Sequence, residues 1–340
     1  MTYLNLINPY AFVMLIRRWL YWRGILRSYH PGIPVISIGN LSMGGSGKSP
    51  LVMEVAKYLI EQRGKRVAIV SRGYRRKSKG FVLVRDGTTT LADVASSGDE
   101  AQMFAELVPQ AIVIVDEDRV RGATKAKDLG AEVVILDDGY QHLRIQRNLN
   151  ILLFDSSRRL STVIPLGRFR EPLSTVRAAD VVVFTRADDK QRVRSLWERL
   201  KSNLKSDFIA ATLHTVADEL KTIDGATNVE LSSLKGKRVL AVSSIASPRR
   251  FSQMLDDTGA EVISRNLGDH ADYSVSLVIA MLRDAERSGV EMLITTQKDA
   301  VKSRQFFLQA HPNIRILVLS LKIEFLSGEQ SFYAAIDRLL

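Results

Sequence analysis

Residues 38–50 read Ile-Gly-Asn-Leu-Ser-Met-Gly-Gly-Ser-Gly-Lys-Ser-Pro, and this stretch decides the fold. It follows a short β-branched run at 34–38 and precedes residues 51–60, whose apolar side chains recur at helical spacing. A glycine-rich turn between a strand and a helix lets backbone N–H groups surround an anion, and the positive end of the helix strengthens the attraction. The stretch therefore predicts a phosphate-binding loop.

The loop supplies the side chains that a nucleotide requires. Lys48 can reach the β- and γ-phosphates, and Ser49 can offer its hydroxyl to Mg²⁺. The usual first glycine, five residues before Gly47, is Ser42 here, whereas the core from Gly44 onward is complete. The alternative is a glycine-rich turn with a solvated lysine. The residues expected to bind the nucleotide are Met43, Gly44, Gly45, Ser46, Gly47, Lys48 and Ser49.

The composition indicates a folded protein with an acidic partner. A length of 340 residues suits two domains, and 46% hydrophobic with 25% charged residues is ordinary for a folded chain. The absence of cysteine excludes disulfides, thiol catalysis and thiolate metal sites. The net charge of +11 points to nucleic acid, anionic lipid or a phosphorylated substrate.

The N-terminal segment is both cationic and aromatic. No Asp or Glu precedes Glu54, and the apolar core at 11–16 is too short to span a bilayer. Basic residues follow that core and no small-residue cleavage site appears, so no signal peptide is expected. We expect an amphipathic helix within residues 1–30 that lies in a membrane interface, with packing on the protein's own core as the alternative. Its apolar stripe comprises Leu15, Trp19, Trp22 and Leu26.

Apolar β-branched runs alternate with helical stretches over residues 31–205. Buried strands separated by helices predict an α/β fold, a P-loop NTPase-like, doubly wound and mainly parallel sheet with ligands at the carboxyl ends of its strands. A second strand set predicts a smaller α/β domain at 206–340, which closes over the active site. The expected strands of the first domain are 34–38, 66–70, 81–84, 111–115, 133–136, 151–154 and 181–184.

Two carboxylates, Asp137 and Asp138, follow the apolar run at 133–136. A P-loop kinase needs a carboxylate at such a position to hold Mg²⁺ beside the loop serine. The alternative is a turn formed by Asp-Gly. Gln141 and His142 come next and could position the substrate, although a structural hydrogen bond explains them equally well.

Several other positions carry both a chemical and a structural interpretation. Asp99 stands before a helix, either as a cap or as the general base for an attacking hydroxyl. His270, between two acids, is either oriented for proton transfer or structural. Arg170 could stabilise phosphoryl charge and Glu171 could support the metal; a solvated capping pair is the alternative.

Two basic motifs follow the ends of predicted strands. Arg72, Tyr74 and Arg75 belong to a cluster that could bind a phosphate of the acceptor or could form ordinary surface. Residues 185–188, Thr-Arg-Ala-Asp, are similar to the Thr-Lys-x-Asp element that reads guanine, with Arg in place of Lys. The second motif keeps a GTPase open as an interpretation.

Taken together, these segments closely resemble the tetraacyldisaccharide 4'-kinases, the lipid A 4'-kinases of Gram-negative bacteria. The most diagnostic stretches are Asp-Asp-Gly-Tyr-Gln-His at 137–142 and Arg-Glu-Pro-Leu-Ser at 170–174. Two positions depart from the family pattern: Ala271 stands where a second histidine is frequent, and Gln297 where glutamate is frequent. The matching segments are 38–50, 71–75, 98–100, 134–147, 165–174, 269–273 and 295–301.

The resemblance implies transfer of the ATP γ-phosphate to the 4'-hydroxyl of a tetraacylated glucosamine disaccharide 1-phosphate. It also implies a peripheral enzyme at the cytoplasmic face of the inner membrane, with ATP and Mg²⁺ as cofactors. Asp99 would be the base, and His270 would assist it from the other domain. The residues that would serve the phosphates and the metal are Lys48, Ser49, Asp137 and Asp138.

The alternative function is a membrane-recruited P-loop switch or partitioning ATPase without lipid kinase activity. Asp99 and His270 discriminate between the two functions, because a switch needs no base for a sugar hydroxyl. A nucleic-acid partner is not expected, since no recognition helix or aromatic stacking platform accompanies the basic residues. The sequence leaves the oligomeric state open.

Overall fold

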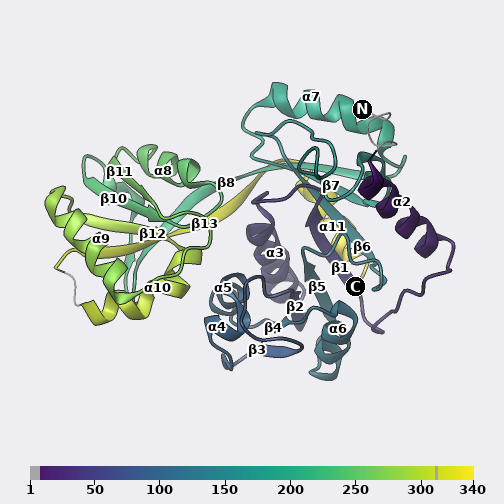
Figure 1. The fold of residues 1–340 in the computed structure, drawn as a ribbon, viewed down its shortest axis with the longest axis horizontal. Helices are drawn as coiled ribbons and strands as arrows, with labels where there is room; N and C mark the ends of the chain where they lie inside the picture. The colour runs from purple at the N-terminus through teal and green to yellow at the C-terminus, as the bar shows by residue number, and fades with distance from the viewer. Residues whose placement is uncertain (1–7, 311–312) are drawn as a thin grey trace. The chain divides into compact units, whose positions relative to one another are not determined.

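A computed structural model describes residues 8–310 and 313–340, which divide into two units. The first unit comprises residues up to Thr215 together with Ile323–Leu340, and the second comprises Val216–Lys322 (Figure 1). Two long strands, β8 (Ile209–Thr222) and β13 (Arg315–Ser327), contribute residues to both units.

The first unit contains a sheet in the order β8-β7-β6-β1-β5-β2-β4-β3. Its strands pair in parallel except β3, which runs antiparallel to β4. Every residue of β1, β2, β5 and β7 is buried, which explains why β2, β5 and β7 are apolar up to a polar last residue. Besides β8, the strands are β1 (Val35–Asn40), β2 (Val67–Ser71), β3 (Val82–Asp86), β4 (Ile112–Val115), β5 (Val133–Asp137), β6 (Leu149–Asp155) and β7 (Val181–Thr185).

Helices cover both faces of this sheet. On one face Ala123 and Ala126 of α6 pack with Val134 and Leu136 of β5, and α3 contacts the same strand from the other side. The doubly wound α/β fold is thereby confirmed. The helices are α2 (Pro9–Trp22), α3 (Lys48–Lys57) with its π-helical extension η1 (Tyr58–Gln62), α4 (Val94–Ser97), α5 (Asp99–Leu107), α6 (Arg119–Asp128), η2 (Leu173–Ala178), α7 (Lys190–Leu200), η3 (Lys201–Asn203) and α11 (Glu329–Asp337).

The second unit is a smaller parallel sheet in the order β11-β10-β12-β13. The short strand β9 (Asn228–Val229) pairs with the end of β8. Apolar side chains pack on the sheet in two clusters, one centred on Phe307 and one on Phe251. The remaining elements are η4 (Leu231–Leu234), β10 (Arg238–Ser243), α8 (Pro248–Asp256), β11 (Glu261–Asn266), α9 (Val275–Arg287), β12 (Met292–Thr296) and α10 (Gln297–Ala310).

The division differs from the sequence prediction at the C-terminus. The second domain was expected to run to residue 340, but residues from Ile323 onward belong to the first unit. Tyr333 of α11 stacks on Tyr58 with ring centroids 4.1 Å apart, and its hydroxyl donates to Glu54 over 2.8 Å. Arg63 pairs with Asp337 over 2.7 Å. These partners lie more than 270 positions apart in the chain, so no local pattern signals them.

We predict that Phe332→Ala destabilises the first unit selectively. Phe332 is fully buried and its ring centroid lies 5.2 Å from that of Phe325, so its loss should cost about 3–5 kcal/mol of unfolding free energy. Hydrogen exchange should quicken in α3 and η1 and stay unchanged in β10–β12. The control is Leu308→Ala, an exposed position in the second unit, which should have little effect. Faster exchange confined to β10–β12 would contradict the assignment of α11 to the first unit.

Candidate active site

The predicted phosphate-binding loop connects the end of β1 to the start of α3. Gly44 and Gly47 adopt φ values of 94° and 81°, a left-handed conformation that favours glycine. The Thr185 hydroxyl at the end of β7 donates to the carbonyl of Ser46 over 2.9 Å and ties the loop to the sheet. The Ser46 hydroxyl is buried and has no hydrogen-bond partner among the described residues. The loop therefore has a backbone conformation suited to binding an anion, and the Ser46 hydroxyl is available to donate a hydrogen bond to it.

Asp138 is held between two cations beside this loop. The Arg170 guanidinium donates to both of its carboxylate oxygens, over 2.6 and 2.8 Å, and Lys48 Nζ lies 3.3 Å from Oδ1. Both cations also donate to the Asn40 side chain, over 3.0 Å from Lys48 and 2.7 Å from Arg170. Burial alone would raise the pKa of Asp138, but Lys48 and Arg170 outweigh it and keep the pKa well below its usual range. Asp138 is therefore ionised.

Asp137, the last residue of β5, has the opposite character. Its carboxylate is 3% exposed and accepts a hydrogen bond from the Ser71 hydroxyl over 3.0 Å. Burial, with Glu100 and Asp138 nearby, raises the pKa of Asp137 to about 7. Two adjacent carboxylates thus differ in the ease with which each carries a charge.

The oxygen donors here fit a magnesium ion that arrives with a nucleotide. Mg²⁺ is usually held by one or two carboxylates together with phosphate oxygens. Within residues 8–310 and 313–340, no three His, Cys, Asp or Glu side chains are arranged to hold a metal by themselves. The hydroxyl of Ser49 and the carboxylates of Asp137 and Asp138 supply hard oxygen donors of the kind that Mg²⁺ takes. These ligands suit a site in which the protein and the nucleotide phosphates coordinate Mg²⁺ together, rather than a site made of protein ligands alone.

Asp99 is the first residue of α5 and is buried. The N-cap of α5 is Gly98, and Asp99 Oδ1 accepts the N–H of Glu100 within the first turn over 2.9 Å. A Cβ at Gly98 would lie 2.9 Å from the carbonyl of Tyr74, which places the start of α5 against the loop that follows β2. The adjacent Glu100 is one of the charges that raise the pKa of Asp137. The structure therefore brings Asp99 close to the loop at 72–75.

Glu171 has a different partner from the expected metal. It is fully buried and accepts two hydrogen bonds from Arg18 of α2, over 3.0 and 2.6 Å. Arg18 also lies 4.9 Å from the centroid of the buried Tyr140 ring. Glu171 therefore anchors α2 to the first unit through Oε2, and the metal contact expected for it stays a prediction.

The remaining predicted residues fall into three groups. Gln141 donates to the backbone carbonyl of Asn40 over 3.0 Å, which favours the structural interpretation of this residue. Arg75 lies over the exposed Tyr74 ring at 5.7 Å, on the loop after β2 that also carries Arg72. His270 lies in the second unit at φ 59°, where its N–H donates to Ser244 and its ring contacts Lys298 over 3.3 Å.

Sequence reasoning missed Asn40, Ser71 and Glu100. Asn40 accepts hydrogen bonds from Lys48 and Arg170, and it is the polar residue at the exact point where β1 becomes the loop. Ser71 likewise ends β2. For Asn40 and Ser71 the available signal was a polar residue that ends a buried parallel strand, because such ends meet at one edge of the sheet. Glu100, the second residue of α5, carries no such signal.

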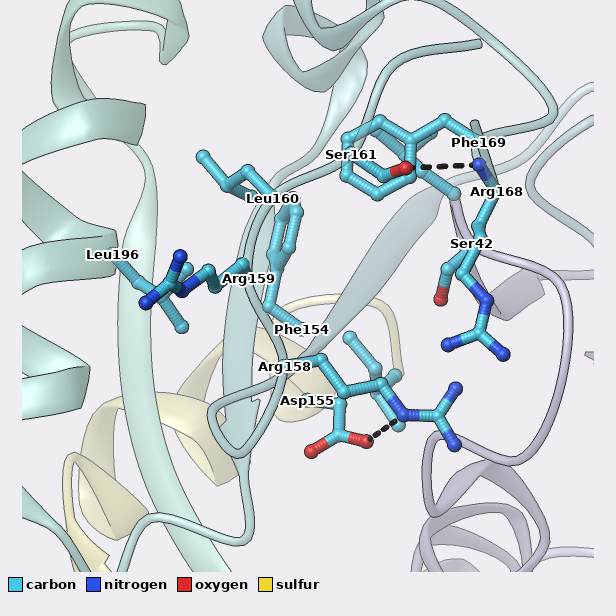
Figure 2. Close-up of a pocket in the computed structure, with 12 residues that line it drawn as sticks. Ser42, Phe154, Asp155, Arg158, Arg159, Leu160, Ser161, Arg168, Phe169 and Leu196 are labelled. Carbon is cyan, nitrogen blue, oxygen red and sulfur yellow. Dashed lines mark hydrogen bonds and ion pairs between the residues drawn. The ribbon is translucent and has the colours of Figure 1, made fainter. Parts of the chain in front are cut away.

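A cavity of about 340 Å³ adjoins the start of the loop (Figure 2). Arg158 pairs with Asp155 over 3.0 Å, and the N–H of Arg168 donates to the Ser161 hydroxyl over 2.9 Å. Ser42, the residue at the place of the usual first glycine, lines the cavity together with three arginines above an apolar floor. The cavity extends the cationic surroundings of the loop toward β6.

Helix α2 is docked by a few residues and exposes the rest of its apolar surface. Ala11 is its buried apolar residue, and Asn8 caps it and donates to the Ile164 carbonyl over 3.0 Å. Arg17 and Arg18 face the protein, where they bond to Gln141 and Glu171. None of the described helices is long and apolar enough to cross a membrane. The exposed apolar side chains of α2 and the following turn are Phe12, Val13, Leu15, Ile16, Trp19, Trp22, Ile25 and Leu26.

We predict that Asp137→Asn stabilises the metal-free protein in a pH-dependent way. Because the folded-state pKa lies above the unfolded value, the wild type loses stability as pH rises toward about 7. The asparagine has no proton to lose. Its advantage in unfolding free energy should therefore grow by about 2 kcal/mol between about pH 5.5 and about pH 8.5. Urea unfolding in a chelator measures it, with the exposed Asp207→Asn as control. An advantage independent of pH would contradict the raised pKa.

Comparison with known proteins assigns the chain to a family. The family described as Tetraacyldisaccharide-1-P 4'-kinase matches residues 4–340. The tetraacyldisaccharide 4'-kinase of Pelodictyon phaeoclathratiforme is 36% identical, over 94% of this chain and 92% of its own. That of Anaeromyxobacter sp. is 35% identical, over 98% and 88%. The crystal structure of "apo" form LpxK from Aquifex aeolicus in complex with ATP superposes with a TM-score of 0.78 at 32% identity, covering 97% of this chain and 96% of that one. The chain belongs to the tetraacyldisaccharide 4'-kinase family.

Proposed function

We propose that the protein transfers the γ-phosphoryl group of ATP to the 4'-hydroxyl of tetraacyldisaccharide 1-phosphate, a step of lipid A biosynthesis. The observation that carries this function is the convergence of Lys48 and Arg170 on Asp138 beside the phosphate loop, in a chain that matches the kinase family over nearly its full length. The switch or partitioning ATPase considered from the sequence receives no support from the relatives or from the similar structure.

The mechanism rests on positioning and on charge. Mg²⁺, when bound with ATP, neutralises charge on the phosphate oxygens. Lys48 and Arg170 are already oriented by Asn40 and Asp138, so little reorganisation is needed when a phosphate enters between them. Asp137 gives up its proton more readily as positive charge approaches, because its raised pKa comes from burial and neighbouring carboxylates. Preformed cations and a responsive carboxylate suit phosphoryl transfer.

Asp99 is our candidate for the base that accepts the proton of the 4'-hydroxyl. Its burial at the start of α5, beside the loop at 72–75, supports this proposal, as does the influence of the adjacent Glu100 on Asp137. We assign His270 of the second unit to assist Asp99, and the second unit to close over the site. The residues Arg72, Tyr74 and Arg75 then contact the acceptor.

Helix α2 is our candidate for the membrane contact. It presents large apolar side chains to the outside while Arg18 and Ala11 fix it to the first unit. An apolar, tryptophan-rich helix face of this kind suits the interface of a bilayer. We place the enzyme peripherally at the cytoplasmic face of the inner membrane, where a lipid acceptor would be found.

The function is tested by transfer of radiolabel from γ-labelled ATP to purified tetraacyldisaccharide 1-phosphate in detergent micelles. Labelled lipid is expected with Mg²⁺ present and not with a chelator. Hydrolysis of ATP with unlabelled lipid would overturn the kinase function.

We predict that Asp99→Ala lowers lipid labelling by about 10²–10⁴-fold, the usual contribution of a general base. ATP affinity, measured by calorimetry, should stay nearly unchanged. The matched control Asp207→Ala removes an exposed carboxylate and should retain full activity. Loss of ATP binding in the Asp99 variant would instead assign this residue to the fold or to the loop.

We predict that replacing Trp19 and Trp22 together with Glu weakens vesicle binding at least about tenfold, since 48% and 77% of these residues are exposed. Deleting residues 1–27 should weaken binding as well, but it also removes Arg18 and leaves Glu171 buried without its cation. The double substitution therefore tests the apolar face of α2 while the Arg18–Glu171 ion pair is retained. Leu308→Glu, an exposed apolar position on α10, serves as control. Equal sedimentation of wild type and double variant with vesicles would refute the interfacial helix.

A further inference from the structure

The connection from β11 to α9, residues 267–274, carries His270 in an uncommon backbone conformation. Gly268 and His270 have φ values of 82° and 59°. This left-handed region is open to glycine, whereas a histidine keeps such a conformation only where its surroundings hold the backbone in place. The groups that hold the backbone at His270 come from the end of β10 and from the first two turns of α10.

Asp299 of α10 and Lys302, one turn later, form a buried ion pair next to this connection. Asp299 is fully buried, the Lys302 side chain is 11% exposed, and Lys302 Nζ lies 3.6 Å from Asp299 Oδ1. Asp299 also accepts the hydroxyl of Thr296 over 2.7 Å and the N–H of Ser244 over 3.0 Å. The Ser244 hydroxyl donates to the same carboxylate. Several donors thus compensate the buried charge, as its removal from water requires.

The ion pair is bonded to the backbone on both sides of the His270 side chain. Lys302 Nζ donates to the carbonyl of Ala271 over 3.1 Å and to the Ser244 hydroxyl over 2.8 Å. The carbonyl of Ser244 accepts the N–H of His270 over 3.0 Å. One connected group of residues, Asp299, Lys302 and Ser244, therefore fixes the N–H of His270 and the carbonyl of the next residue.

Helix α10 also contacts the His270 ring. Lys298 Nζ lies 3.3 Å from Nε2 of His270, and the Asp269 carboxylate lies 3.8 Å from the same nitrogen. The His270 side chain is 13% exposed, so most of its surface is in contact with the protein. Because Lys298 and Lys302 stand one turn apart on α10, a single rigid element contacts both the ring and the backbone of this connection.

The chemistry of the ion pair points to a geometric role rather than to a large contribution to stability. Apolar side chains of similar volume often stabilise a protein as well as a buried ion pair does. Such side chains at 299 and 302 could fill the same space, but they could not donate a hydrogen bond to the carbonyl of Ala271. The pair therefore supplies directed hydrogen bonds to one short segment, the segment that carries His270.

We propose that Asp299 and Lys302 are positioning residues for His270 and that Ser244 joins them to it. This assignment rests on the proposed function, in which His270 assists Asp99. The pair acts through His270: Lys302 bonds to the backbone beside it, and Asp299 orients both Lys302 and Ser244. Without the pair, the backbone at His270 can leave its left-handed conformation, and the imidazole moves with it.

The test measures lipid labelling from γ-labelled ATP by the double variant Asp299→Asn/Lys302→Met, which removes both charges and nearly preserves side-chain volume. We expect kcat to fall at least about fivefold and no further than in His270→Ala, since a small displacement of a catalytic group can cost up to about 100-fold. KM for ATP and for the lipid should change by less than about twofold. The matched control Lys237→Met/Glu291→Gln removes an exposed ion pair of 2.6 Å from the same unit and should keep its kcat.

A double-mutant cycle separates action through His270 from a general effect on the fold. In the His270→Ala background, Asp299→Asn/Lys302→Met should lower kcat by less than about twofold. Ser244→Ala keeps both charges and removes only the hydroxyl between them, so it should give a smaller loss with the same dependence on His270. This variant decides the matter if the double variant does not fold. In spectra of histidine-labelled protein, the ring signal absent from His270→Ala should shift in the folded variants and not in the control.

The outcomes distinguish this assignment from the function on which it rests. Equal losses of kcat with and without His270, a loss confined to KM, or an unshifted His270 signal would overturn the positioning assignment and leave the kinase function standing. Full activity of His270→Ala would overturn it as well, because His270 would then have no role for the pair to support. A wild-type protein that labels no lipid would overturn the function and the assignment together.

Discussion

The parallel pairing of β1 with β5 is the constraint on which the site depends. In this register Ile38 lies opposite Asp137, so the strand that enters the phosphate loop and the strand that delivers the carboxylates end side by side. The turn after β5 then passes very close to β1: a Cβ at Gly39 would lie 2.7 Å from the Cβ of Tyr140. Any side chain at residue 39 would push the turn away. Lys48 and Arg170 can meet both Asp138 and the Asn40 side chain only because this approach is allowed.

The two adjacent carboxylates at the end of β5, Asp137 and Asp138, differ in their environment and therefore in their pKa. Asp138 turns toward Lys48 and Arg170 and is ionised, whereas Asp137 is enclosed by the sheet with the Ser71 hydroxyl as its donor. The difference comes from the neighbours and not from the residue type. One carboxylate orients cations before a ligand arrives, and the other responds to the charge that a ligand brings.

The sequence predicted the structure best where a functional element is a contiguous stretch of the chain. The loop at 38–50, the strand that ends in Asp137 and the helix that starts at Asp99 are contiguous patterns, and the structure contains all three elements. Contacts between distant residues were not predictable. Glu171 meets Arg18 across 153 positions, and α11 returns to α3 after the whole second unit has intervened. In both cases the sequence shows the residue types but nothing in their spacing indicates a partner. Asn40 was missed for another reason: its role depends on the end of a neighbouring strand.

The ion pair between Arg18 and Glu171 connects helix α2 to the residues around Asp138, because Glu171 is the neighbour of Arg170 in the chain. Glu171 forms an ion pair with Arg18 of α2, and the preceding residue, Arg170, forms one with Asp138. The apolar face of α2 and the residues around Asp138 are therefore linked through two adjacent residues, Arg170 and Glu171. On the proposed function, the depth to which α2 settles among the headgroups sets the height of the reacting centre above the bilayer. The distance between the membrane surface and the reacting groups then determines which hydroxyl of the lipid head the enzyme can reach.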